Sequence, residues 1–143
     1  MAKPQHFNII NRIVCEEIRQ EKSNKFILLG VFSGDILVEK FPADVPLSLF
    51  LEGKVDSQDE GVLHIRFSGP GDGSALMSVH YKPHESGLVA LPTPRFTVTM
   101  EKPGTFKVEL SEDQKTWETV VEKEVILGHD LWALAPIVMQ PPS

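Results

Sequence analysis

CEEIRQEKSNKFILLGVFSGDILV occupies residues 15–38, and within it a dense run of charge turns abruptly into a run that is almost wholly apolar. The element that contains its charged half begins earlier in the chain. Ile10, Val14 and Ile18 recur every four residues, as they would in a helix. Residues 7–20 are also rich in Ile and Val, whose branched side chains favour a pleated sheet. We predict a strand over residues 7–20.

A second strand is expected directly after a short polar turn. The residues EKSN supply that turn, and Asn24 tolerates a left-handed backbone conformation. Residues 25–33 are apolar at both odd and even positions, which is typical of a strand buried on both faces. A two-residue turn at Ser23 and Asn24 would set the register of this hairpin. The expected pairs are Glu21 with Phe26, Arg19 with Leu28, Glu17 with Gly30, and Cys15 with Phe32.

This register gives the charged residues a structural role. Glu17, Arg19 and Glu21 would share one face, with the Arg19 guanidinium between two carboxylates. Phe26 and Leu28 would lie on the same face, so that Arg19 could lay its alkyl stem over them. A partly buried arrangement of this kind fixes strand register more than it adds stability. We therefore interpret the three charged residues as a structural brace.

The rest of the chain is typical of short strands separated by turns. Apolar and polar residues alternate in VLHIRF, ALMSVHY, RFTVTM and GTFKVEL, as expected for strands with one buried face. Residues 82–94 contain several prolines and are expected to form a loop or an edge crossing. About eight strands at this spacing predict a β-sandwich or a barrel.

We therefore predict an all-β fold, a single-domain antiparallel β-sandwich of immunoglobulin-like or C2-like type, over residues 1–131. Residues 132–143 are expected to be a C-terminal extension, either flexible or interface-forming. Its apolar residues, among them Trp132 and Ile137, would dock on a partner or a symmetry mate, or would cover the open end of the domain itself.

Composition and charge disfavour several classes of function. The chain has 143 residues, 41% of them apolar, and a formal net charge of -6, which disfavours binding to nucleic acid or to an anionic membrane surface. The longest apolar run is far too short to span a bilayer. The first residues, MAKPQHFN, have no hydrophobic segment, so we expect no secretory signal. With a single cysteine, these features predict a cytoplasmic protein.

No catalytic motif is found. A G-x-S-x-G elbow is absent, and the glycine-rich SGPGDG lacks the lysine of a phosphate-binding loop, so it is typical of a hairpin turn. Cys15 is followed by Glu16 and Glu17, whose negative charge would raise the thiol pKa and make a poor nucleophile. We predict that Cys15 is a small buried residue, that the protein is not an enzyme and that it needs no cofactor.

One group of polar residues is a candidate binding surface. If the glycine-rich turn pairs Phe67 with Ala75, His64 faces Ser78, and His80 lies diagonally from His64. The candidate surface then consists of His64, Arg66, Ser78 and His80. The alternative is an ordinary solvated sheet face, which such polar residues normally line.

The histidines could instead form a metal site. His80 and His84 are four residues apart, but they straddle a strand end and a loop. Zinc needs three or four ligands, and the only cysteine is distant in sequence. We therefore expect no metal, and we keep a small-ligand or metal site at His64, His80 and His84 as an alternative.

The opening third of the chain resembles a known family. Residues 15–32 are similar to the N-terminal signature of small bacterial and phage-associated proteins that carry a domain of unknown function. The matching positions are Cys15, Ile18, Arg19, Glu21, Lys25, Leu28, Gly30, Val31 and Phe32. The resemblance implies an all-β sandwich, and it transfers no catalytic or ligand-binding residue.

These observations rank the functions. The leading hypothesis is a non-enzymatic cytoplasmic binding or assembly module, with a protein partner or a homo-oligomer as the complex it forms. The alternatives are the small-ligand or metal site at the histidines and, from the resemblance alone, a structural component of a phage or bacterial assembly. Neither nucleic acid nor a membrane is expected as a partner.

Overall fold

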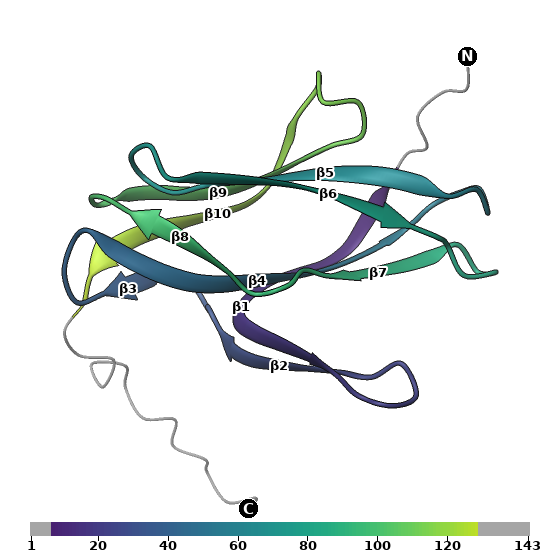
Figure 1. Cartoon of the computed structure of the whole chain (residues 1–143), viewed down its shortest axis with the longest axis horizontal. Helices are drawn as coiled ribbons and strands as arrows, with labels where there is room; N and C mark the ends of the chain where they lie inside the picture. The colour runs from purple at the N-terminus through teal and green to yellow at the C-terminus, as the bar shows by residue number, and fades with distance from the viewer. Residues whose placement is uncertain (1–6, 129–143) are drawn as a thin grey trace, which may run out of the picture.

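The computed structural model describes residues 7–128, which form ten strands and no helix (Figure 1). Because residues 7–128 contain no helix, they contain none that could cross a membrane. The strands are β1 (Asn8–Gln20), β2 (Phe26–Val31), β3 (Ile36–Val38), β4 (Ala43–Lys54), β5 (Gly61–Ser68), β6 (Ser74–Tyr81), β7 (Leu88–Pro92), β8 (Phe96–Met100), β9 (Gly104–Ser111) and β10 (Glu118–Leu127). The predicted all-β fold is confirmed, with more strands than the sequence pattern indicated. The predicted extension, residues 132–143, lies outside the described residues.

The strands form two sheets. The first has the order β2-β1-β4-β7, with β8 paired to another part of β4, and its pairs are all antiparallel. The second has the order β3-β10-β9-β5-β6, and it is mixed because Ile36 of β3 pairs in parallel with Val125 of β10. The prediction of a purely antiparallel sandwich is therefore wrong. The chain reaches β3 only after passing through β1 and β2 of the other sheet, and no sequence pattern fixes the direction in which so short a strand joins β10.

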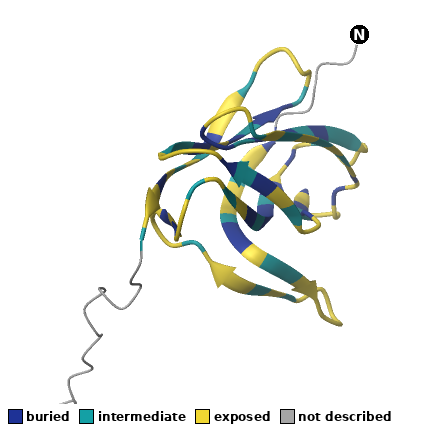
Figure 2. Ribbon diagram, turned by 60° about the vertical axis from the view of Figure 1, so that its left-hand side comes forward, coloured by how far each residue is buried: buried dark blue, intermediate teal, exposed yellow. Residues whose placement is uncertain are grey.

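The core lies between the sheets and is built by alternation. Leu49 and Leu51 of β4 are fully buried, as are Ile65 of β5 and Phe106 and Val108 of β9. The predicted inward faces of β5 and β9 are thus confirmed (Figure 2). In β6 only Tyr81 is buried, since this strand is the outer edge of its sheet.

β7 and β8 follow one another along the same edge of β4. In β7, Leu91 pairs with Leu51, and in β8, Val98 pairs with Val45. The predicted loop or edge crossing of residues 82–94 thus contains an edge strand, and such a strand accommodates Pro92 because its outer side needs no hydrogen-bond donor.

The β1–β2 hairpin differs from its predicted register by one residue. The Glu21 N–H donates to the Lys25 carbonyl at 2.7 Å, so the turn holds three residues instead of two, and Ser23 and Asn24 both have positive φ, 67° and 58°. The observed pairs are Gln20 with Phe26, Arg19 with Ile27, Ile18 with Leu28, Glu17 with Leu29, and Cys15 with Val31. A shift of one residue exchanges the two faces of a strand. The strand predicted at residues 25–33 is also mostly exposed, so the prediction of burial on both faces is wrong.

Candidate functional site

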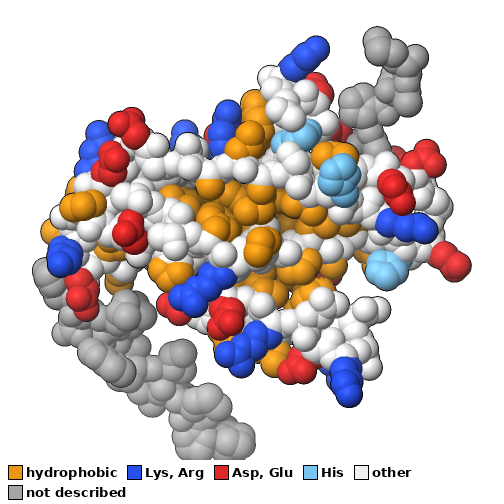
Figure 3. Space-filling model, in the orientation of Figure 1, with side chains coloured by type: hydrophobic (Ala, Val, Ile, Leu, Met, Phe, Trp, Pro, Cys, Tyr) orange, Lys and Arg blue, Asp and Glu red, His pale blue; other side chains and the backbone are white. Residues whose placement is uncertain are grey.

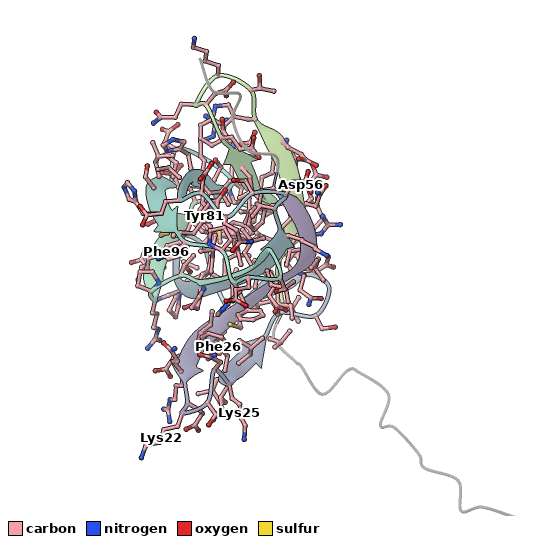
Figure 4. All side chains as sticks on the ribbon, turned by 90° about the vertical axis from the view of Figure 1, so that its right-hand side faces the viewer. Lys22, Lys25, Phe26, Asp56, Tyr81 and Phe96 are labelled. Atoms are coloured by element: carbon pink, nitrogen blue, oxygen red, sulfur yellow. The ribbon has the colours of Figure 1, made fainter. Side chains whose placement is uncertain are left out.

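A two-stranded arm projects from the first sheet. β1 leaves β4 at Cys15, which pairs with Ser48, and beyond that point its pairs are with β2 alone among the described residues. β2 is the outermost strand of the sheet. Residues 16–31, called the arm below, therefore extend away from the two sheets as a ribbon (Figure 1). Lys22 and Lys25 lie at its tip (Figure 4).

One face of the arm is a row of exposed apolar side chains. Ile27, Leu29 and Val31 alternate along β2 and are 39%, 36% and 51% exposed. Alternate residues of a strand point to the same side, so the three side chains form one row. Apolar residues scattered singly on a surface need no explanation, whereas a contiguous row on a projecting edge is typical of an interaction site.

The opposite face of the arm contacts the first sheet through Phe26. The Phe26 ring lies 5.3 Å from the Phe50 ring of β4, measured between centroids, and Ile18 and Leu28 are half-buried. Phe26 lies nearer the body of the molecule than the tip lysines do (Figure 4). This contact holds the arm against β4 while its other face stays open to solvent.

The predicted brace lies on the exposed face. The Arg19 guanidinium is 3.6 Å from the Glu17 carboxylate, and the two side chains are 64% and 40% exposed. Because the register is shifted, Arg19 lies beside Ile27 and Glu17 beside Leu29, not beside the half-buried Phe26 and Leu28. No ion pair of Glu21 is found within residues 7–128. Because both side chains are exposed, Glu17 and Arg19 belong to the surface that the arm presents. Exposed ion pairs contribute little to stability.

Gly30 has a left-handed backbone conformation near the base of the arm. Its φ is +64°, a conformation that favours glycine, and a Cβ atom there would come within 2.8 Å of the Glu16 side chain. The space beside Gly30 is thus filled by the side chain of Glu16.

Cys15 is buried at the point where the arm begins. Its side chain has no exposed surface, and its thiol donates to the Glu17 carbonyl at 3.5 Å. Burial raises the pKa of the Cys15 thiol, and the nearby charge of Glu16 adds to the rise, against the opposing effect of the hydrogen bond to Glu17. The prediction of a buried cysteine is confirmed.

The candidate surface on β5 and β6 has the predicted register. Phe67 pairs with Ala75 and His64 with Ser78, while His80 pairs with Val62 and so lies diagonally from His64. His64 Nδ1 is 2.7 Å from Ser78 Oγ. The three described histidines all lie on the face shown in Figure 3.

Arg66 is held by two neighbours. It donates through Nε and Nη2 to the two carboxylate oxygens of Glu109, each at 3.2 Å, and its guanidinium carbon lies 4.1 Å from the Trp117 ring centroid. Trp117 ends the loop that begins after Ser111. The charge of Arg66 is thus engaged by Glu109 and its planar face by Trp117. Arg66 therefore connects this loop to the sheet.

The loop contributes polar residues that sequence analysis missed. The Gln114 side-chain nitrogen lies 3.3 Å from His64 Nδ1, and Gln114 itself has positive φ, 63°. Asp113 Oδ1 accepts from the Lys115 and Thr116 N–H groups at 2.8 and 2.9 Å, and these bonds lower the Asp113 pKa. The residues SEDQ are typical of a turn, but nothing in them shows that the turn folds back over His64.

The histidines do not converge. His80 and His84 line one pocket with Phe26 and Leu88, between the arm and β7, and His64 is not part of its lining. Within residues 7–128, no group of three His, Cys, Asp or Glu side chains is placed to hold a metal ion. The geometry that would favour the metal alternative is therefore not observed in this part of the chain.

Comparisons with protein-family models, with curated proteins and with solved structures find no match to this chain. The resemblance of residues 15–32 to a bacterial and phage-associated family stays a prediction.

Proposed function

We propose that this protein is a non-enzymatic binding or assembly module, and that the arm is its contact element. The observation that carries the proposal is the exposed row of Ile27, Leu29 and Val31 on a ribbon whose outer edge is unpaired within the described residues. A two-stranded ribbon is marginal in water, and an unpaired edge offers its backbone groups to another strand. Both features favour an arm that binds a partner.

The edge of β2 lacks the usual protection. Edge strands are normally blunted by charged side chains or proline. From Phe26 to Val31 the sequence FILLGV contains neither. The charges that do lie on this face, Glu17 and Arg19, belong to β1 and are paired with each other. The arm thus combines an apolar centre with a polar margin, which is the usual anatomy of a protein interface.

The histidine surface supports binding less well. His64 and Arg66 are already engaged by Ser78, Gln114, Glu109 and Trp117. A residue whose polar groups are satisfied within the molecule would have to give up those bonds to bind a ligand. We therefore assign these residues to the attachment of the loop, and His80 and His84 to the margin of the pocket beside the arm.

The remaining parts of the hypothesis rest on sequence alone. A cytoplasmic location, an immunoglobulin-like or C2-like topology and a role in a phage or bacterial assembly stay predictions. The proposal of a protein partner does not depend on any of them.

Capture from a lysate of the native host tests the proposal. Leu29→Lys places a charge in the apolar row and should abolish recovery of proteins that the wild-type chain retains. Ile10→Lys is the matched control, since Ile10 lies on the same strand as the arm, is 53% exposed and is outside the arm. Recovery of the same proteins by both variants would show that the arm is not the contact element, and recovery of nothing above background by the wild type would contradict a heterologous partner.

A further inference from the structure

We infer that the arm binds a second copy of this chain, through antiparallel pairing of β2 with β2 about a two-fold axis near Leu28. This inference rests on the proposed function and names its partner. A two-fold interface is self-complementary, so the same residues must serve on both sides. The edge strand, its side chains and the charges around it each meet that requirement.

The side chains of β2 match those of an inverted copy. Pairing about Leu28 places Ile27 opposite Leu29 of the second copy, and Phe26 opposite Gly30. The two isoleucines and two leucines then form one continuous apolar row on the exposed face, and cross-strand apolar pairs stabilise a sheet. Phe26, opposite Gly30, already packs against Phe50 of its own chain.

The charges of the arm select the antiparallel arrangement. Lys22 and Lys25 lie at the tip, whereas Glu16 and Asp35 lie at or next to the base. All four are exposed, and none of them forms an ion pair within residues 7–128. Antiparallel pairing brings the tip of each arm, where two lysines outnumber Glu21, beside the acidic base of the other. Parallel pairing would bring tip against tip and like charges together.

The other edge strands fit a second copy less well. β7 contains Pro92, which cannot donate a backbone hydrogen bond. The exposed positions of β6 include Ser74, Ser78 and His80. β3 has only three residues. In β8, which also lies at an edge, the apolar residues are buried or half-buried, so among the described edges β2 alone joins an exposed apolar row to a sequence free of charge and proline.

Sedimentation equilibrium of the purified full chain tests the inference. The wild type should be a dimer in reversible equilibrium with monomer, and Leu29→Lys should raise the dissociation constant at least ~10-fold because it puts two charges into the apolar row. Ile10→Lys should leave the dissociation constant unchanged. Circular dichroism of both variants shows whether the fold is retained, which is expected because both sites are exposed.

A charge exchange tests the direction of pairing. Lys22→Glu should weaken the dimer, and Asp35→Lys in the same chain should restore it, since each reversed charge then meets its reversed partner. If the double variant dissociates as readily as the single variant, the antiparallel arrangement is overturned.

Disulfide formation tests the register. A mixture of chains carrying Ile27→Cys and Leu29→Cys should give covalently linked dimers on mild oxidation, whereas either variant alone should give far fewer. Cys15 is buried and serves as an internal control in both chains.

The failure of this inference can be told from failure of the proposed function. A wild-type chain that stays monomeric at every concentration, or a dimer that Leu29→Lys leaves intact, overturns the second copy as partner. If Leu29→Lys nevertheless abolishes capture of another protein from the host lysate, the arm remains the contact element.

Discussion

Thr93, which lies between β7 and β8, forms two hydrogen bonds with Leu49 of β4. The Thr93 N–H donates to the Leu49 carbonyl at 2.9 Å, and the Leu49 N–H donates to Thr93 Oγ1 at 2.8 Å. Here the side-chain oxygen takes the place of a backbone acceptor. The two residues are buried, so a lost bond would not be replaced by water.

Replacing Thr93→Val should therefore destabilise the protein by about 1–3 kcal/mol, because the Leu49 N–H would be left buried without an acceptor while the shape of the side chain is kept. Urea denaturation of both proteins measures this free energy of unfolding. Ser48→Ala is the matched control, since the Ser48 hydroxyl is buried and has no hydrogen-bond partner within the described residues. Its removal should be neutral or stabilising, and a loss as large as that of Thr93→Val would refute the argument.

The β5–β6 hairpin was predictable from sequence and the β1–β2 hairpin was only partly so. In β5 and β6 the alternation of residues specifies which face is buried, and the pairing of Phe67 with Ala75 follows from it. In β2 both faces are apolar, so alternation gives no register. The register then depends on whether the turn holds two or three residues, and Ser23 and Asn24 permit either because both accept positive φ.

The exposure of β2 could not be predicted from its composition. A run such as FILLGV is normally found inside a sheet, covered on both faces. Here β1 leaves β4 at Cys15, so nothing within the described residues covers the outer face of β2. That departure depends on the length of the β1–β4 pairing, which is a long-range property. The pairing of His64 with Ser78 was predicted correctly, but the contacts of His64 with Gln114 and of Arg66 with Trp117 join residues far apart in the chain.

Arg19→Ala should change the free energy of unfolding by less than about 0.5 kcal/mol. The Arg19–Glu17 pair is exposed on both sides and is screened by water, so little stability depends on it. Thermal denaturation in low salt, where the pair is least screened, is the most sensitive measurement. Arg19→Leu, which keeps an apolar stem, should give the same result, and a clear loss in Arg19→Ala alone would restore the hypothesis of a brace.

The Cys15 thiol should react with a disulfide reagent far more slowly in the native protein than in the unfolded one. It is buried, and its raised pKa keeps it protonated at neutral pH. The raised pKa also affects stability. The fold favours the neutral thiol. The contribution of Cys15 to the free energy of unfolding is therefore complete below the thiol pKa of the unfolded chain, and it is lost as the pH rises from that value toward the thiol pKa of the folded protein.

Urea denaturation at about pH 7 and about pH 10, on either side of the ordinary thiol pKa, measures this loss. Cys15→Ala costs packing at both pH values, but it should make the fall between them smaller than in the wild type. An equal fall in the two proteins would show that Cys15 does not contribute to alkaline instability.

The loop over His64 should loosen at acid pH because of Asp113. The Thr116 and Lys115 N–H groups donate to its carboxylate, and the Ser111 hydroxyl does so at 3.1 Å, which favours the charged form and lowers the pKa. A lowered pKa stabilises the fold above the pKa of the unfolded chain, and that contribution is lost as pH falls through the folded value.

Trp117 at the end of the loop reports this loosening of the loop, because its ring lies against Arg66. In a Trp132→Phe background, the fluorescence of Trp117 should shift in acid with the midpoint of Asp113. Asp113→Ala should give the acid spectrum already at neutral pH, and a variant with the wild-type spectrum and titration would show that other contacts order the loop.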